Sequence, residues 1–118
     1  MILVVDDNEL NLALAQAVLE RAGYEVEAAR SGSAAVTSIE RRRPDLVLMD
    51  VQLPDRDGLE VTRDLKSRPA TAGIRIVALT AHAMVGDAET ALAAGCAGYI
   101  CKPINTRTFA DEVARFLA

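Results

Sequence analysis

The sequence predicts an α/β fold in which a parallel sheet carries helices on both faces. Short, wholly apolar stretches such as Ile2–Val5 and Leu46–Met49 indicate strands that are buried on both sides, as in a parallel sheet. Segments with apolar residues at helical spacing follow them, so that strand and helix alternate five times along the 118 residues. Strict alternation of this kind predicts one open sheet with right-handed crossovers. The length suits one domain, which we expect to span residues 1–118.

Composition and charge exclude several classes of protein. The chain is 51% hydrophobic but only 3% aromatic, so we expect a core built mostly from Ala, Val, Leu and Ile. The net charge of -4 argues against nucleic-acid binding, which needs a basic surface. No apolar stretch approaches the roughly 20 residues of a membrane span. The start, Met1–Val5, has neither the length nor the basic residues of a signal peptide.

The two cysteines, Cys96 and Cys101, do not form a C-x-x-C pair. We interpret both as small buried hydrophobic residues in a reducing environment, without a disulfide or a metal. The chain is therefore expected to be cytoplasmic.

The first two strand–helix units occupy the N-terminal third of the chain. Ile2–Val5 ends on Asp6 and Asp7, and Asn8 is placed to cap a helix that ends at Gly23 in a left-handed turn. The apolar positions of this helix are Leu10, Leu12, Leu14, Val18 and Leu19.

Polar and apolar residues alternate over Tyr24–Ala29, which predicts an outer, half-exposed strand. Ser31 opens a second helix, which Arg41–Arg43 closes with charges that complement the helix dipole. These arginines could bind an acidic partner, but we favour a solvated helix end.

The central strand ends on a carboxylate. Leu46–Met49 leads directly into Asp50, and the composition of residues 51–58 is that of a turn. In open α/β sheets, ligands bind at the carboxyl ends of the strands, which is where Asp50 lies. Taken alone, Asp50 could equally end a strand or cap a turn, so the other strand ends decide.

The second half of the chain continues the alternation. Asp57 and Gly58 begin a third helix through Leu65, and a loop over residues 68–73 follows. The remaining elements are a strand over 74–79 that ends on Thr80, an Ala-rich helix over 83–94 ended by Gly95, a strand over 98–101 that ends on Lys102, and a last helix that opens at Asn105 and Thr106.

Four of the five predicted strands end on a polar functional group: Asp6 and Asp7, Asp50, Thr80, and Lys102. Carboxyl ends of parallel strands share one edge of the sheet, so these groups should converge there. Three converging carboxylates need a cation, and a set of oxygen ligands without His or thiolate suits Mg²⁺. A carboxylate nucleophile, a divalent metal, a hydroxyl and a lysine are the parts that phosphoryl transfer to Asp requires.

The chain resembles the receiver domains of two-component response regulators. The resemblance covers the whole chain and rests on four motifs in register: Val4–Asn8, Leu48–Pro54, Ala78–Ala81 and Tyr99–Ile104. It implies a flavodoxin-like doubly wound (βα)5 fold, with a five-stranded parallel sheet of order 2-1-3-4-5. The segments 7–11 and 80–84 look most similar to single-domain regulators and to receivers of hybrid histidine kinases.

The resemblance also implies roles for individual residues. Asp50 would be the phosphoacceptor, while Asp6, Asp7, Asp50 and the backbone carbonyl of Gln52 would hold Mg²⁺, for which Mn²⁺ could substitute. Thr80 and Lys102 would bind the phosphoryl oxygens, and Ala81 would leave space for the phosphate. Thr80 and Tyr99 would form the switch. The bond from Lys102 to Pro103 would be cis.

Each of these residues also has a simpler interpretation. Asp6 or Asp7 could cap the first helix, Thr80 could cap the fourth, and Lys102 could be solvated. Tyr99 could belong to the core. Asp55 and Asp57 are better explained as loop and helix-cap residues than as rival acceptors. His82, the single histidine, is expected to lie near the site and not to be a phosphohistidine.

The resemblance implies a histidine kinase or histidine phosphotransfer protein as phosphoryl donor, and a downstream protein as target. The chain would catalyse only its own phosphorylation and dephosphorylation. Gln52 and His82, two positions after Asp50 and Thr80, would flank the hydrolytic water and tune the lifetime of the phosphoryl group. We expect the His82 ring to obstruct that water.

Three alternatives are less well supported. A phosphatase of the haloacid-dehalogenase type needs a second Asp where Gln52 stands. An interaction module that works without phosphorylation would lack the acceptor, an acid or the lysine. A flavin-binding fold would need a phosphate loop after the first strand, and none is present.

Overall fold

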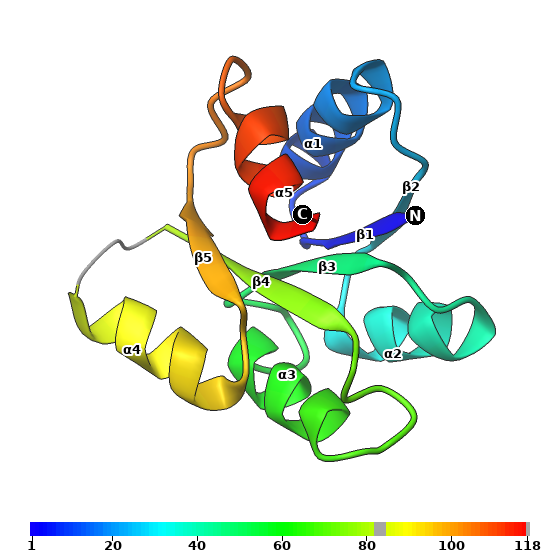
Figure 1. Ribbon diagram of the computed structural model, residues 1–118, viewed down its shortest axis with the longest axis vertical. Coiled ribbons are helices and arrows are strands. Elements are labelled where there is room, and N and C mark those ends of the chain that lie inside the picture. Colours follow the sequence, from blue (N-terminus) through cyan, green and yellow to red (C-terminus); the bar gives the residue numbers. More distant parts are fainter. Residues whose placement is uncertain (82–84, 118) are drawn as a thin grey trace.

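A computed structural model describes residues 1–81 and 85–117 of the chain. Five parallel strands form one sheet in the order β2-β1-β3-β4-β5, which confirms the predicted fold (Figure 1). The strands are β1 (Ile2–Val5), β2 (Val26–Ala29), β3 (Leu46–Asp50), β4 (Arg75–Thr80) and β5 (Gly98–Cys101). The helices between them are α1 (Glu9–Arg21), α2 (Gly32–Arg41), α3 (Gly58–Lys66), α4 (Val85–Ala94) and α5 (Phe109–Leu117).

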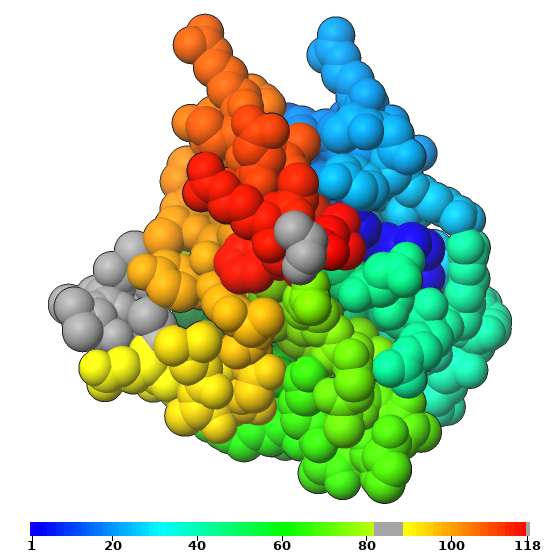
Figure 2. All heavy atoms as spheres, viewed as in Figure 1, coloured from blue at the N-terminus to red at the C-terminus, as the bar shows by residue number. Residues whose placement is uncertain are grey.

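Helices cover both faces of the sheet. α1 and α5 pack on one face, and α2, α3 and α4 pack on the other (Figure 1). Successive residues of β1 and β3 point to opposite faces, so Leu3 and Val47 join one core while Ile2 and Leu46 join the other. This explains why the central strands are apolar at every position. Figure 2 shows α5, in red, seated against the blue N-terminal elements.

The predicted helix ends have the expected capping geometry. Asn8 accepts a hydrogen bond from Asn11 N at 3.0 Å, and Ser31 accepts one from Ala34 N at 3.0 Å. Asp57 does the same for α3, through Leu59 N at 2.8 Å. At the other end of α1, Gly23 has a φ of 98°, a backbone conformation that residues with a Cβ atom rarely adopt. These caps fix where each strand leads into its helix.

Four expectations were wrong in detail. β4 begins at Arg75 and not at Ile74, whose backbone N–H instead donates to the carbonyl of Thr71 at 3.0 Å. β2 begins at Val26 and not at Tyr24, because only the residues from Val26 pair with β1. α5 begins at Phe109 and not at Asn105, because Asn105 first forms a turn in which its side chain accepts from Arg107 N at 2.9 Å. Cys101 is exposed, whereas Cys96 is buried as expected.

The exposure of Cys101 has a simple cause. β5 is an edge strand, so alternate residues of this strand face solvent and only Ile100 is fully buried. Both cysteines are free.

The arginines that close α2 contact neighbouring segments. Arg42 forms a two-pronged ion pair with Glu25, with distances of 2.6 and 2.7 Å, and Arg43 donates to the carbonyl of Ala70 at 2.7 Å. Two of the three arginines therefore form contacts within the chain.

In the described part of the chain, no helix has the length and apolar character needed to cross a membrane.

Candidate phosphoryl-transfer and metal site

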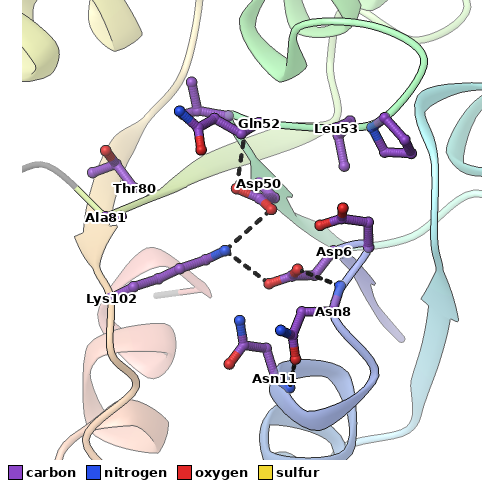
Figure 3. A pocket seen from close by; sticks show the side chains of 12 residues that line it. Asp6, Asn8, Asn11, Asp50, Gln52, Leu53, Thr80, Ala81 and Lys102 are labelled. Atoms are coloured by element: carbon purple, nitrogen blue, oxygen red, sulfur yellow. Dashed lines mark hydrogen bonds and ion pairs between the residues drawn. The ribbon is translucent and has the colours of Figure 1, made fainter.

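The carboxyl ends of β1, β3, β4 and β5 enclose a cleft of about 580 Å³ (Figure 3). The predicted site residues meet there, because parallel strands present their carboxyl ends at one edge. The lining includes Asp6, Asp7, Asp50, Gln52, Thr80, Ala81 and Lys102. The strand-end groups that the sequence singled out are therefore brought together in one place.

Lys102 connects two of the buried carboxylates. Its Nζ lies 2.9 Å from Asp6 Oδ2 and 3.1 Å from Asp50 Oδ2 (Figure 3). The lysine side chain is only 16% exposed, so the alternative of a freely solvated lysine is wrong. Asp50 is held on its other side by Gln52 N, which donates to Oδ1 at 3.2 Å. One ammonium group thus stands between two acids, which leaves the cleft with an excess of negative charge.

Burial and pairing act in opposite directions on these groups. Burial raises the pKa of Asp50 above its ordinary value, and the contacts with Lys102 and Gln52 N offset that effect only in part. Burial also acts to lower the pKa of Lys102, but the contacts with Asp6 and Asp50 together outweigh it and raise the pKa. The lysine is therefore held in its charged form beside the acids.

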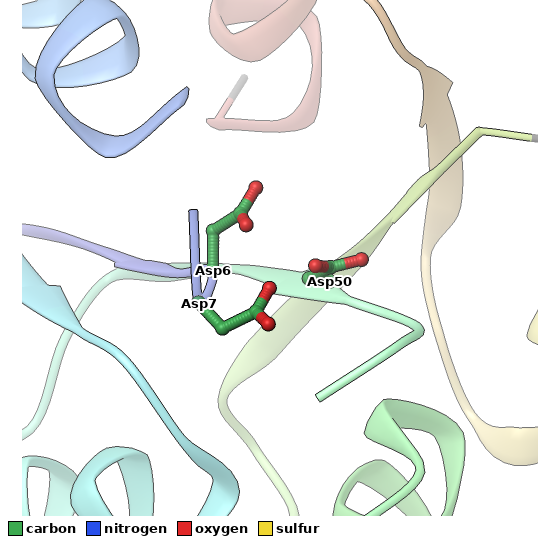
Figure 4. A group of neighbouring side chains, drawn as sticks. All are labelled: Asp6, Asp7 and Asp50. Carbon is green, nitrogen blue, oxygen red and sulfur yellow. The ribbon is translucent and has the colours of Figure 1, made fainter. Parts of the chain in front are cut away.

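Asp6, Asp7 and Asp50 form a cluster that fits a divalent cation (Figure 4). One ligand oxygen from each lies within 4.8 Å of the others. Asp6 Oδ2 is buried and, apart from the ion pair with Lys102, has no hydrogen-bond partner among the described residues. Three neighbouring carboxylates match the oxygen ligands that Mg²⁺ prefers.

The first two acids of the cluster have different local roles. Asp6 is buried and its Oδ1 accepts from Asn8 N at 2.9 Å, whereas Asp7 is exposed. The cap of α1 itself is Asn8. The alternative that Asp6 or Asp7 exists to cap α1 is therefore wrong.

The loop between β3 and α3 is folded tightly under Asp50. Val51 N donates to the carbonyl of Leu79 at 3.1 Å, and Gly58 N donates to the carbonyl of Val51 at 2.8 Å. A Cβ atom on Gly58 would lie 1.9 Å from Asp50 O. Only glycine allows α3 to start this close to the end of β3, which sets the position of the loop that carries Gln52.

Thr80 and Tyr99, the two residues predicted for the switch, line a common small cavity. Thr80 is the last residue of β4 and lines the main cleft. Thr80 and Tyr99 also line a separate cavity of about 40 Å³. Tyr99 is 39% exposed, so the alternative that it is a core residue is wrong.

The bond between Lys102 and Pro103 is cis, as the family resemblance implied. His82 lies outside the described residues.

Other cleft residues escaped the sequence analysis as site residues. Asn8, Asn11, Leu53 and Pro54 also line the cleft. Asn8 and Asn11 are three positions apart at the start of a helix that follows the two acids, and this spacing was a signal that could have been used. Leu53 and Pro54 had no such signal, because their position depends on how the loop folds.

Comparison with known proteins gives one consistent result. The family model of the response regulator receiver domain matches residues 2–114. The polar-differentiation response regulator DivK of Brucella anthropi is 42% identical over 116 residues, which are 98% of this chain and 94% of that protein.

Solved structures agree with this result. The chemotaxis response regulator CheY4 of Vibrio cholerae has a TM-score of 0.93 at 28% identity, covering 98% of this chain and 97% of that one. The receiver domain of sensor histidine kinase PA1611 from Pseudomonas aeruginosa has a TM-score of 0.87 at 38% identity, covering 98% and 95%. That structure holds a magnesium ion coordinated in its active site cleft.

Proposed function

This chain belongs to the response regulator receiver domain family, and from that membership we propose that Asp50 accepts a phosphoryl group from a histidine of a partner protein. Phosphorelay signalling is the general function of such domains in two-component systems. The observation that carries the assignment of Asp50 is its place at the end of the central strand, inside the cleft and 3.1 Å from Lys102 Nζ. We take residues 1–118 as one receiver domain.

In the proposed transfer, the chain contributes groups that line the cleft. A carboxylate oxygen of Asp50 attacks phosphorus and forms an O–P bond, while the N–P bond of the donor histidine breaks. The electron pair of that bond stays on the histidine nitrogen, which takes up a proton. The Lys102 ammonium and the Thr80 hydroxyl bind phosphoryl oxygens, and Ala81 leaves room for them. The chain modifies itself and later hydrolyses its own acyl phosphate, so it turns over no external substrate.

The proposal includes a divalent cation, Mg²⁺ or Mn²⁺. Asp6, Asp7, Asp50 and the backbone carbonyl of Gln52 would hold it. When bound, the cation supplies positive charge that offsets the negative charge of the carboxylates and of the phosphoryl oxygens. Support comes from the acidic cluster, from the buried Asp6 Oδ2, whose contact among the described residues is the ion pair with Lys102, and from the magnesium-bound structure of the related PA1611 domain.

The acceptor assignment is tested by intact-mass measurement after incubation with acetyl phosphate and Mg²⁺. We expect one base-labile phosphoryl group on the wild type and none on Asp50→Asn. Asp111→Asn removes an exposed acid of α5 and serves as the matched control, which should be labelled like the wild type. Equal labelling of Asp50→Asn would exclude Asp50 as the acceptor.

We propose that phosphorylation is read out through Thr80 and Tyr99, by a protein that binds next to β5. The added charge, about -1.5 to -2, would bias the position of the Thr80 hydroxyl, and the small cavity shared with Tyr99 gives the ring a place to turn inward. A beryllofluoride complex should shift the amide resonances of Gly98–Cys101 in the wild type. The same shifts in Thr80→Ala would mean that the hydroxyl does not couple the two sites.

The lifetime of the phosphoryl group is a further part of the proposal. Gln52 is exposed at the mouth of the cleft and can orient a water toward Asp50. We propose that His82 obstructs the same water. The partner that donates the phosphoryl group is a histidine kinase or a histidine phosphotransfer protein, and both would meet the chain in the cytoplasm.

A further inference from the structure

Asp55 links the loop between β3 and α3 to the start of α2, a helix that precedes β3 in the chain. Its carboxylate accepts hydrogen bonds from Gly32 N at 2.8 Å, from Ser33 N at 3.0 Å and from Ser33 Oγ at 2.9 Å. Gly32 and Ser33 are the first two residues of α2. Three hydrogen bonds accepted by one exposed carboxylate are more than a chance surface contact requires.

Helix α2 has a cap of its own. Ser31 accepts a hydrogen bond from Ala34 N, as an N-cap residue does. Asp55 accepts hydrogen bonds from the two preceding backbone N–H groups, those of Gly32 and Ser33. Side chains from two separate segments therefore pair with the free N–H groups at the start of α2. The contact of Asp55 therefore adds something that a local cap does not: it fastens the β3–α3 loop to α2.

The loop is held at its base by its own strand–helix unit. Gln52 and Asp57 face each other in an isolated antiparallel bridge, and residues 53–56 project beyond this bridge. Leu53 is half-buried against the core, and Arg56 pairs with Glu60 of α3 at 3.3 Å. Among the hydrogen bonds of the described residues, those of Asp55 are the ones that tie the projecting part to α2.

Glycine at position 32 also allows the loop to lie close to α2. A Cβ atom on Gly32 would lie 3.0 Å from Val61 Cγ2, 3.3 Å from Asp55 Oδ1 and 3.5 Å from Arg56 Cβ. The absence of a side chain therefore leaves room for the Asp55 carboxylate beside the start of α2. The hydrogen bonds of Asp55 oppose movement of the loop away from α2.

We propose that Asp55 is a positioning residue, which holds the β3–α3 loop so that the Gln52 carbonyl is placed to bind the cation that accompanies the phosphoryl group. This inference rests on the proposed function, because it assigns a cation to the cleft. Asp55 itself touches neither ligand. It acts through Leu53 and Pro54, the two residues that separate it from Gln52.

The test compares two variants that weaken the same helix start. Asp55→Ala removes the bonds between the loop and α2, whereas Ser31→Ala removes a capping bond of α2 and leaves the loop fastened. Mg²⁺ is titrated into each protein and its dissociation constant is measured from the amide shifts around Gln52. Groups that directly orient a metal ligand change affinity by about 10-fold to 100-fold. Because Asp55 acts less directly, we expect about 10-fold weaker binding in Asp55→Ala and less than about twofold in Ser31→Ala.

A second readout separates positioning from a general loss of structure. Asp55→Ala should be phosphorylated slowly by acetyl phosphate at low Mg²⁺ but at the wild-type rate at saturating Mg²⁺, because Asp50, Thr80 and Lys102 are intact. Ser33→Ala, which loses only the hydroxyl contact, should fall between Asp55→Ala and the wild type.

Equal Mg²⁺ affinities in Asp55→Ala and Ser31→Ala would overturn the proposal, as would a slow rate that saturating Mg²⁺ does not restore. A wild type that binds Mg²⁺ but takes no phosphoryl group on Asp50 would contradict the proposed function alone, since the comparison of affinities would still decide the role of Asp55.

Discussion

At the scale of single residues, Asp55 links the stability of the fold to pH. Hydrogen bonds from Gly32 N, Ser33 N and Ser33 Oγ lower the pKa of Asp55 to about 2, compared with 3.8 for an ordinary aspartate. The folded state therefore favours the carboxylate. Its contribution to stability is fully present above about pH 4 and is lost as the pH falls toward about 2.

We predict that the urea midpoints of the wild type and Asp55→Asn differ at pH 6 and converge between about pH 4 and 2. Ser31→Ala provides the control, because the serine cap has no titratable group and its midpoint difference should not vary in this way. A constant difference between wild type and Asp55→Asn over that range would contradict the assignment.

Residue patterns predicted the strand ends better than they predicted exposure. Asp6, Asp50, Thr80 and Lys102 were found because each follows an apolar stretch, and a parallel sheet gathers such ends. The burial of Cys101 was predicted wrongly because cysteine is usually a buried residue type. Its exposure here depends on the position of β5 at the edge of the sheet. Edge position is a property of the whole sheet, which no local pattern contains.

At the scale of elements, the junction between β3 and α3 depends on Gly58. A Cβ atom there would lie 1.9 Å from Asp50 O and 2.9 Å from Asp50 C, both atoms of the backbone. Gly58→Ala must therefore push α3 away from the end of β3. We expect a loss of about 3 kcal/mol or more in the free energy of unfolding, at the upper end of what overpacking costs.

Gly73→Ala is the matched control for that prediction. A Cβ atom on Gly73 would meet only Arg43 Nη2, the end of a flexible side chain, at 2.9 Å. Its cost should stay within about 0.5 kcal/mol. Urea unfolding of the two variants checks the difference, and similar losses in both would mean that the junction can adjust.

Helix starts were predictable where a cap lies next to the helix, and not where a turn intervenes. Asn8, Ser31 and Asp57 directly precede their helices and were identified from the sequence. Asn105 is also a residue type that favours the N-cap position, but its side chain accepts a hydrogen bond from Arg107 N and closes a turn. The helix therefore begins later, at Phe109. The capping signal marks a hydrogen-bonded side chain, and tertiary packing decides which turn continues as a helix.

At the scale of the whole molecule, local patterns predicted the alternation but not every long-range connection. The strand order 2-1-3-4-5 came from the family resemblance, because apolar periodicity does not specify which strands become neighbours. The bond between Asp55 and Gly32 joins residues 23 positions apart and has no signature in the sequence. Such contacts follow from the fold, and they could be recognised only once the fold was known.

The acidic cluster should couple cation binding to the stability of the entire domain. Both cores include residues of β1 and β3, so the strands that carry Asp6, Asp7 and Asp50 unfold with the rest of the chain. A cation that binds only the folded state stabilises it by mass action. With a dissociation constant of about 1 mM, 10 mM Mg²⁺ would add about 1.4 kcal/mol, or about 5 °C in the melting temperature.

This prediction is checked by thermal unfolding with and without MgCl₂, with NaCl of equal ionic strength as the control for screening. Asp7→Asn removes one exposed acid of the cluster and with it part of the repulsion between the carboxylates. We therefore expect this variant to melt above the wild type without Mg²⁺ and to gain less when Mg²⁺ is added. The two effects have opposite signs, so a general change in stability cannot produce both. If Asp7→Asn gained as much from Mg²⁺ as the wild type, the ion would be binding somewhere other than this cluster.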